Sequence, residues 1–164
     1  MQKPLVNYAY IDGANLHNAM GDLGWKLDYS RFHVWLKEKY AVKRAYIFIG
    51  LIPKYRDLYT YLQECGFTLI FKEITYDGSG KPKGNCDADL VLQVMQDAYE
   101  GIMKRAVLIS SDGDYEGVVK FLKSRNKIEI ILSPSRKEKC SILLKRTNVP
   151  IAYVGDQKSI LELK

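Results

Sequence analysis

Short apolar runs alternate with segments of helical length along the whole chain of 164 residues, and this alternation restricts the fold more than any other feature. The runs predict buried strands, with a sixth strand at 151–154. The first five are 8–11, 45–50, 67–71, 106–110 and 128–132. Strands that are separated by helices favour parallel pairing. The alternation therefore predicts a mostly parallel central sheet of five to six strands between two layers of helices, a three-layer α/β/α fold.

Helical patterns fill the intervals between these strands. They cover 29–39, 54–64, 88–99, 115–124 and 137–145, and a further helix follows the first strand. The longest irregular piece, 73–86, is rich in Gly and Lys, and a loop of that length in a small domain is more often functional than idle. Since no repeat or linker divides the chain, we expect one domain over 1–164.

Composition excludes several other classes of protein. No apolar run approaches the roughly 18 residues of a membrane span, and no apolar leader follows the N-terminus. We therefore expect no membrane association and a cytoplasmic location. The three cysteines lack a CxxC spacing, which predicts reduced thiols and no zinc site.

Carboxylates gather at three of the predicted element boundaries. Asp12 ends the first strand, Asp112 and Asp114 follow the fourth strand, and Asp87 opens the helix before that strand. The carboxyl ends of parallel strands share one edge of the sheet, where ligands bind. Two unit charges about 4 Å apart repel by about 4 kcal/mol at an effective dielectric constant of about 20. A cation is therefore expected among these acids, and oxygen-only ligands favour Mg²⁺ or Mn²⁺.

The stretch "ISSDGDYEGVV" permits two other interpretations. An EF-hand loop is excluded, because its twelfth position requires Glu and the chain has Lys123 there. A tight turn with Asp114 as the N-cap of the next helix fits the motif taken alone. Because acids occur at three such boundaries, the metal cluster is the favoured interpretation.

Three motifs in register, "YIDGANL", "KGNCDADL" and "LISSDGDY", resemble those of the NYN domain family, close to its LabA-like branch, within the PIN-like nuclease fold. The resemblance covers about residues 5–155 and implies a Rossmann-like sheet and a ribonuclease that depends on Mg²⁺ or Mn²⁺. It also implies site residues. The metal-binding acids are Asp12, Asp87, Asp112 and Asp114; Asn15 orients the site at the first strand, Ser110 supplies a flanking hydroxyl, and Asp89 is an additional candidate.

One position departs from the family pattern. Gln93 is neutral where related helices commonly carry an Asp. The change puts a second metal ion, or full activity, in question, and Asp89 could compensate in part.

Positive charge is concentrated late in the chain. Residues 118–150 contain nine Lys and Arg and two Glu, a net charge of +7, which leaves −1 for the rest of a chain of net charge +6. Such a segment could contact a phosphate backbone, or it could be a solvated helical face. We expect Lys83, Arg136 and Lys137 to bind the substrate backbone and Tyr115 to stack on an unpaired base.

Two functions of different classes follow from the sequence. The first is a metal-dependent endoribonuclease that hydrolyses RNA phosphodiester bonds. The alternative is a catalytically weak or inactive RNA-binding or protein-interaction module on the same fold. RNA is the expected partner, and the sequence leaves homodimer formation open.

Overall fold

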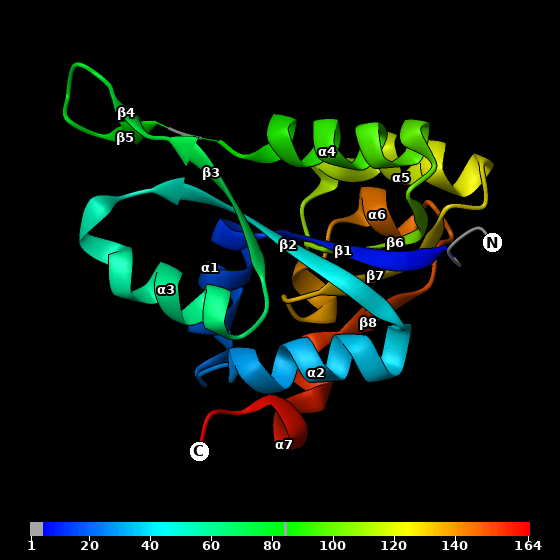
Figure 1. The fold of residues 1–164 in the computed structure, drawn as a ribbon, viewed down its shortest axis with the longest axis horizontal. Helices are drawn as coiled ribbons and strands as arrows, with labels where there is room; N and C mark the ends of the chain where they lie inside the picture. The colour runs from blue at the N-terminus through cyan, green and yellow to red at the C-terminus, as the bar shows by residue number, and fades with distance from the viewer. Residues whose placement is uncertain (1–4, 84) are drawn as a thin grey trace.

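Six parallel strands form the central sheet of the computed structural model, which describes residues 5–83 and 85–164 (Figure 1). The strand order is β3-β2-β1-β6-β7-β8, and every neighbouring pair is parallel. The predicted sheet is therefore confirmed, with all six strands parallel. The strands are β1 (Val6–Asp12), β2 (Val42–Leu51), β3 (Thr68–Glu73), β6 (Met103–Ile109), β7 (Ile128–Ser133) and β8 (Ile151–Tyr153).

Helices cover both faces of this sheet, which completes the predicted three layers (Figure 1). One face carries α1 (Gly13–Leu23), α2 (Tyr29–Tyr40), α3 (Arg56–Glu64) and α7 (Lys158–Leu161). The opposite face carries α4 (Asp87–Glu100), α5 (Glu116–Ser124) and α6 (Ile142–Lys145).

Each face has its own hydrophobic core, because side chains alternate along a strand. In β1, Ala9 and Ile11 join the cluster beneath α1 and α2. Tyr10, between them, joins the cluster beneath α4 and α5. The apolar runs of the sequence thus become strands that are buried on both sides, as parallel sheets require.

The strand order reverses between β1 and β6. From β1 the chain adds strands outward to β3 and then returns to place β6 against the other side of β1, with Ile11 opposite Ile109. The carboxyl ends of β1 and β6 therefore flank the switch point, which is where open α/β sheets bind ligands.

Two predicted helices differ in the structure. The helix expected at 115–124 is preceded by a 3₁₀ turn, η2 (Gly113–Tyr115), so α5 begins at Glu116. Asp112 caps this turn by accepting a hydrogen bond from the Asp114 N–H at 2.9 Å. The interpretation of Asp114 as N-cap is wrong, because Asp112 caps the turn and Tyr115 stands at the N-cap of α5 without a side-chain hydrogen bond.

The helix expected at 137–145 is divided. It consists of η3 (Lys137–Lys139) and the short α6, separated by extended backbone at Cys140 and Ser141. The Ser141 N–H donates to the carbonyl of Ser111 at 3.1 Å, and its side chain accepts from the N–H of Leu143. Tertiary pairing with the Ser111 loop thus replaces one turn of the expected helix.

The predicted irregular loop 73–86 contains a small antiparallel hairpin of β4 (Thr75–Tyr76) and β5 (Pro82–Lys83). The hairpin turn is closed by Asp77, whose Oδ1 accepts hydrogen bonds from the N–H groups of Ser79 and Lys81. It projects from the end of β3 (Figure 1). The side chains of Pro82 and Lys83 lie outside the described part of the structure, as does residue 84. In the segments 5–83 and 85–164, no helix is long and apolar enough to cross a membrane.

The first turn of α1 lies very close to β2. A Cβ atom at Gly13 would lie 2.7 Å from the carbonyl oxygen of Phe48, whereas one at Gly21, later in the same helix, would meet nothing within 4 Å. The glycine at position 13 lets the helix begin directly at the end of β1.

We expect Gly13→Ala and Gly21→Ala to change stability in opposite directions. Gly13→Ala should lower the free energy of unfolding by about 1–3 kcal/mol, because the added methyl group overpacks a backbone contact. Gly21→Ala should raise it by about 0.5–1 kcal/mol, because alanine favours a helix interior. Urea denaturation measures both values, and a stabilising effect at both positions would contradict the close approach of α1 to β2.

Candidate functional site

Three carboxylates from different elements meet at the switch point. Asp12 ends β1, Asp87 begins α4 and Asp112 follows β6. Each offers one oxygen atom, and these three atoms all lie within 4.8 Å of one another. A hard divalent cation needs such an all-oxygen set.

Asp12 is the buried member of this set, with 6% of its surface exposed. It caps α1, and its Oδ1 accepts a hydrogen bond from the N–H of Asn15 at 3.1 Å. Burial above all raises the pKa of Asp12, and the charges of Asp87 and Asp112 raise it further, whereas the hydrogen bonds from Asn15 and Tyr115 lower it. The negative charge at Asp12 is therefore costly without a positive partner.

The Tyr115 hydroxyl lies between two of the acids. It is 3.0 Å from Asp12 Oδ2 and 2.9 Å from Asp87 Oδ1, and the side chain is fully buried. Burial first, and then the charge of Asp12, raises the pKa of this phenol, so it stays protonated. The prediction that Tyr115 stacks on a base is wrong, because its ring is packed in the core beneath α4 and α5.

The single proton of the Tyr115 hydroxyl is shared between two carboxylates, and this favours binding of a cation beside them. A phenol has one proton and can donate it to only one carboxylate at a time. Asp12 and Asp87 both approach the same hydroxyl, so the second of them needs a proton or a cation as its partner. The donor set, which is carboxylate oxygens with no sulfur or imidazole among the three residues, fits Mg²⁺ or Mn²⁺.

Asp114 and Asp89, the other predicted acids, lie outside the set of three. Asp114 is exposed, and its pKa is raised first by the charge of Asp112 and also by contact with Asp87. Asp89 is paired with Lys72 of β3, at 3.6 Å between Nζ and Oδ2. Asp114 therefore stands beside the three carboxylates, while Asp89 is directed to the adjoining edge of the sheet.

Polar side chains fix the loop that carries Asp112. Asn15 Oδ1 accepts hydrogen bonds from the N–H of Ser111 at 3.0 Å and from its hydroxyl at 3.2 Å. The Ser110 hydroxyl accepts from the N–H of Asp112 at 3.1 Å. Asn15 thus ties the first turn of α1 to the end of β6. Ser111, which also bonds to Ser135, was not predicted from the sequence.

Gln93 serves a different carboxylate. Its side-chain amide donates to Asp97 Oδ1 at 2.9 Å, and the Tyr10 hydroxyl donates to Asp97 Oδ2 at 2.7 Å. Asp97 is 1% exposed and was missed by the sequence analysis. The signal was present, because Leu90, Val94 and Asp97 follow the buried spacing of one helix face, with an acid in an apolar position.

The three acids open into a cavity of about 660 Å³. One wall is apolar and comes from the end of β2, the segment that leads into α3 and the segment after β3. We call these side chains the apolar wing: Ile49, Ile52, Tyr55, Leu58 and Ile74.

Two further residues, Tyr59 and Cys86, line the cavity beside this wall. Tyr59 is buried, whereas Tyr55 of the wing is 43% exposed. Burial, and then the charges of nearby acids, raises the pKa of Cys86 to about 11. The thiol at this wall therefore stays neutral and is a poor nucleophile.

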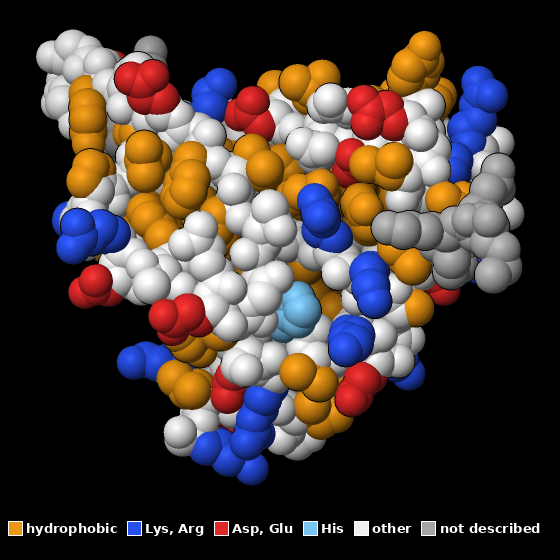
Figure 2. Space-filling view, in the orientation of Figure 1, with side chains coloured by type: hydrophobic (Ala, Val, Ile, Leu, Met, Phe, Trp, Pro, Cys, Tyr) orange, Lys and Arg blue, Asp and Glu red, His pale blue; other side chains and the backbone are white. Residues whose placement is uncertain are grey.

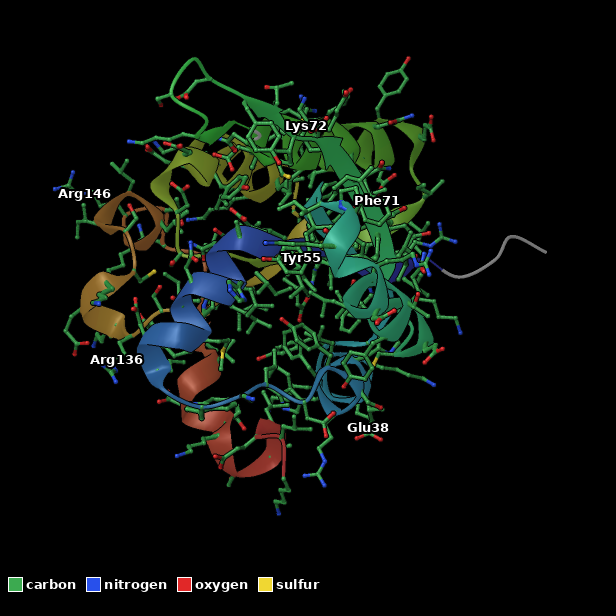
Figure 3. All side chains as sticks on the ribbon, turned by 90° about the vertical axis from the view of Figure 1, so that its left-hand side faces the viewer. Glu38, Tyr55, Phe71, Lys72, Arg136 and Arg146 are labelled. Carbon is green, nitrogen blue, oxygen red and sulfur yellow. The ribbon has the colours of Figure 1, made fainter. Side chains whose placement is uncertain are left out.

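Basic residues lie on the other side of α1 from the apolar wing. Figure 3 shows Arg136 and Arg146 on one side of α1 and Tyr55 between α1 and α3. Arg136 and Lys137 are exposed and directly follow Ser135, which bonds to Ser111 at the site.

The positively charged segment as a whole does not form one face. Lys127 donates to the carbonyl of Met103 at the start of β6, Lys123 donates to the carbonyl of Thr147, and Lys120 pairs with Glu116. Figure 2 shows hydrophobic side chains gathered over the outer ends of β2 and β3, with Lys and Arg dispersed over the rest of this face. Arg136 and Lys137, by contrast, directly follow Ser135, which bonds to Ser111 at the edge of the sheet that carries the acids.

Comparison with known proteins gives a family and a fold. The NYN domain family matches residues 8–149, which is most of the chain. A crystal structure of a protein of unknown function from Vibrio parahaemolyticus is similar over 98% of this chain and 99% of that chain, with a TM-score of 0.77 and 20% sequence identity. At that identity the likeness shows the fold. No curated protein matches the sequence.

We expect Mg²⁺ or Mn²⁺ to raise the melting temperature, because a ligand that binds only the folded state stabilises it. Asp112→Asn should abolish this response and should stabilise the protein in EDTA by relieving repulsion. The matched control is Asp22→Asn, which removes an exposed carboxylate paired with Lys139. Thermal denaturation with and without the metal measures the effect, and an unchanged response in Asp112→Asn would exclude that residue as a ligand.

The two buried tyrosine–aspartate contacts should respond differently to metal. In EDTA, Tyr115→Phe and Tyr10→Phe should each lower the free energy of unfolding by about 1–3 kcal/mol, because each removes one hydrogen-bond donor from a buried carboxylate. Mn²⁺ should reduce the loss of unfolding free energy for Tyr115→Phe but not for Tyr10→Phe. The partners of Tyr115, Asp12 and Asp87, belong to the set of three acids, whereas Asp97, the partner of Tyr10, does not. If Tyr115→Phe loses the same unfolding free energy in EDTA and in Mn²⁺, the Tyr115 hydroxyl has no part in the metal site.

Proposed function

Because the chain belongs to the NYN domain family of PIN-like nucleases, we propose that it is a metal-dependent endoribonuclease that hydrolyses RNA phosphodiester bonds. Within the family we place it in the LabA-like branch, on the motifs around Asp12, Asp87 and Asp112. The observation that carries the proposal is the convergence of these three carboxylates at the mouth of one cavity.

The acids would hold Mg²⁺ or Mn²⁺. When bound, such an ion supplies charge stabilisation at a phosphate oxygen and activates water for in-line attack. The chain's own residues keep the ligands in place: Asn15 fixes Asp12 through its N–H and the Asp112 loop through its side chain. The Tyr115 hydroxyl lies within hydrogen-bond distance of both Asp12 and Asp87, and it thereby links the start of α4 to the end of β1.

Substrate binding is assigned to the basic residues beside the acids. Arg136 and Lys137 are exposed at the end of β7, where a phosphate backbone that approaches the acids would pass. Lys83, in the hairpin after β3, is a further candidate for the same role. These contacts would position RNA without reading its sequence.

The alternative is an RNA-binding or protein-interaction module with little or no activity. Gln93 favours it, because this neutral residue is committed to Asp97 and adds no ligand to the three acids. The proposal of a nuclease is preferred because retention of three converging carboxylates, at a cost in repulsion, serves no purpose in a surface that only binds a polyanion.

Asp12→Asn distinguishes the two functions. It removes one charge from the metal set but keeps the side-chain shape, so RNA cleavage with Mn²⁺ should fall by about 100-fold or more. RNA binding in EDTA should survive, because Arg136 and Lys137 are unchanged and repulsion of phosphate is reduced. Cleavage is followed on several single-stranded and structured RNAs with Mg²⁺, Mn²⁺ or EDTA.

Asp22→Asn is the control for surface charge and should cleave as the wild type does. Equal cleavage by wild type and Asp12→Asn would indicate a contaminating nuclease and exclude the role of Asp12. Binding by the wild type with no metal-dependent cleavage of any RNA would favour the binding module.

A further inference from the structure

We propose that the apolar wing of the cavity binds one unpaired nucleobase of the RNA, next to the phosphate that a cation held by the acids would bind. The inference rests on the proposed function and adds the place at which one base of the substrate is held. Ile52, Tyr55 and Leu58 would be the main contacts of the base.

The first observation is that the acids and the wing line the same cavity. Asp12, Asp87 and Asp112 are among its lining residues, and so are the five residues of the wing. Its volume of about 660 Å³ falls within the range of small-molecule sites, which is about 300–1,000 Å³. A phosphate group alone would leave most of that space unfilled. A ligand that suits the whole cavity has an anionic end for a cation at the acids and an uncharged end for the wing.

The second observation is the chemistry of the wing. Tyr55 and Leu58 remain 43% and 41% exposed although they are large apolar side chains. Within the described part of the chain, the lining residues include no Lys or Arg. The described cavity lining therefore offers no Lys or Arg to a second phosphate, and Lys54, which lies over the Tyr55 ring, is not part of that lining. An uncharged, planar, partly apolar group is a better match, and nucleobases stack on aromatic side chains in this way.

The third observation is that the wing is held firmly. The Tyr59 hydroxyl donates to the carbonyl of Gly50 at 2.9 Å and accepts from the N–H of Ile52 at 3.0 Å. Gly50 also lies so close to Ile74 that a Cβ atom there would be 2.5 Å from Ile74 Cδ1. Lys54 sits over the Tyr55 ring, with its Nζ 5.0 Å from the centroid. The connection from β2 to α3 is thus fixed, so the wall is formed before a ligand arrives.

The position of the wing limits the substrate. Tyr55 lies between α1 and α3, across α1 from Arg136 and Arg146 (Figure 3). A base that entered this cavity to stack on Tyr55 would have left its stack and its pairing partner. Bases in an A-form duplex are paired and stacked, whereas those in loops and single strands can be splayed outward. The geometry therefore favours unpaired RNA over duplex RNA.

The test measures binding of a short unstructured RNA in EDTA, in the Asp12→Asn background so that no cleavage occurs. Tyr55→Ala should weaken binding by about tenfold, the usual contribution of one stacked base. Replacing one nucleotide by an abasic residue should cause a similar loss at a single position. Combining the abasic RNA with Tyr55→Ala should add no further loss, because both changes remove the same contact. A fully paired RNA should be insensitive to Tyr55→Ala.

Tyr61→Ala is the matched control, because Tyr61 lies in α3, the helix that directly follows Tyr55, and is 39% exposed but is not among the residues that line the cavity. Loss of affinity equal to that of Tyr55→Ala would overturn the inference. The inference would also be overturned if no abasic position weakened binding, or if the losses from the abasic RNA and from Tyr55→Ala were additive. If the wild type cuts RNA but no abasic position weakens binding, the proposed nuclease activity is supported and the base site is excluded. If no RNA is cut but the effects of the abasic position and of Tyr55→Ala are coupled, the base site is supported and the nuclease activity is excluded.

Discussion

The parallel pairing of β1 with β6 is the contact on which the rest of the molecule depends. It joins the two halves of the sheet at the point where the strand order reverses, with Ile11 opposite Ile109. Because the two strands run in the same direction, their carboxyl ends bring Asp12 and the Asp112 loop to one edge. Asn15 secures that junction by bonding to Ser111 across it. A shift of register between these strands would separate the acids as well as the two cores.

Two buried tyrosine–aspartate contacts show how the same chemistry serves structure in one place and function in another. Asp97 has two donors, Tyr10 and Gln93, and its two oxygen atoms are both satisfied by the protein. Asp12 and Asp87 share the single proton of Tyr115. The first contact is complete within the fold and fastens α4 to β1. The second has one donor for two carboxylates, and that deficit makes it a candidate site for a cation.

The cavity combines two environments that rarely occur together by chance. Repelling carboxylates stand beside an apolar wall with no cation among its described lining residues. Water solvates the apolar wall poorly and leaves the repulsion between the carboxylates uncompensated, and a nucleotide with its counter-ion would suit both environments. The basic residues at Arg136 and Lys137 lie on the opposite side of α1, so the strand of a bound RNA would be held from one side and its base from the other.

The sequence alone determined the strands, their parallel arrangement and the acids that meet at one edge, because these follow from local patterning and from a topological rule about strand ends. The tertiary structure decided what each acid contacts. Asp89 pairs with Lys72, Asp97 is buried, and Asp112 in place of Asp114 caps the turn before α5. It also buried Tyr115 and exposed Tyr55, although both are tyrosines beside predicted helix starts. Local patterning indicates which face of an element is buried, but the partner that each side chain meets depends on packing between elements that are distant in the chain, and the local pattern does not specify it.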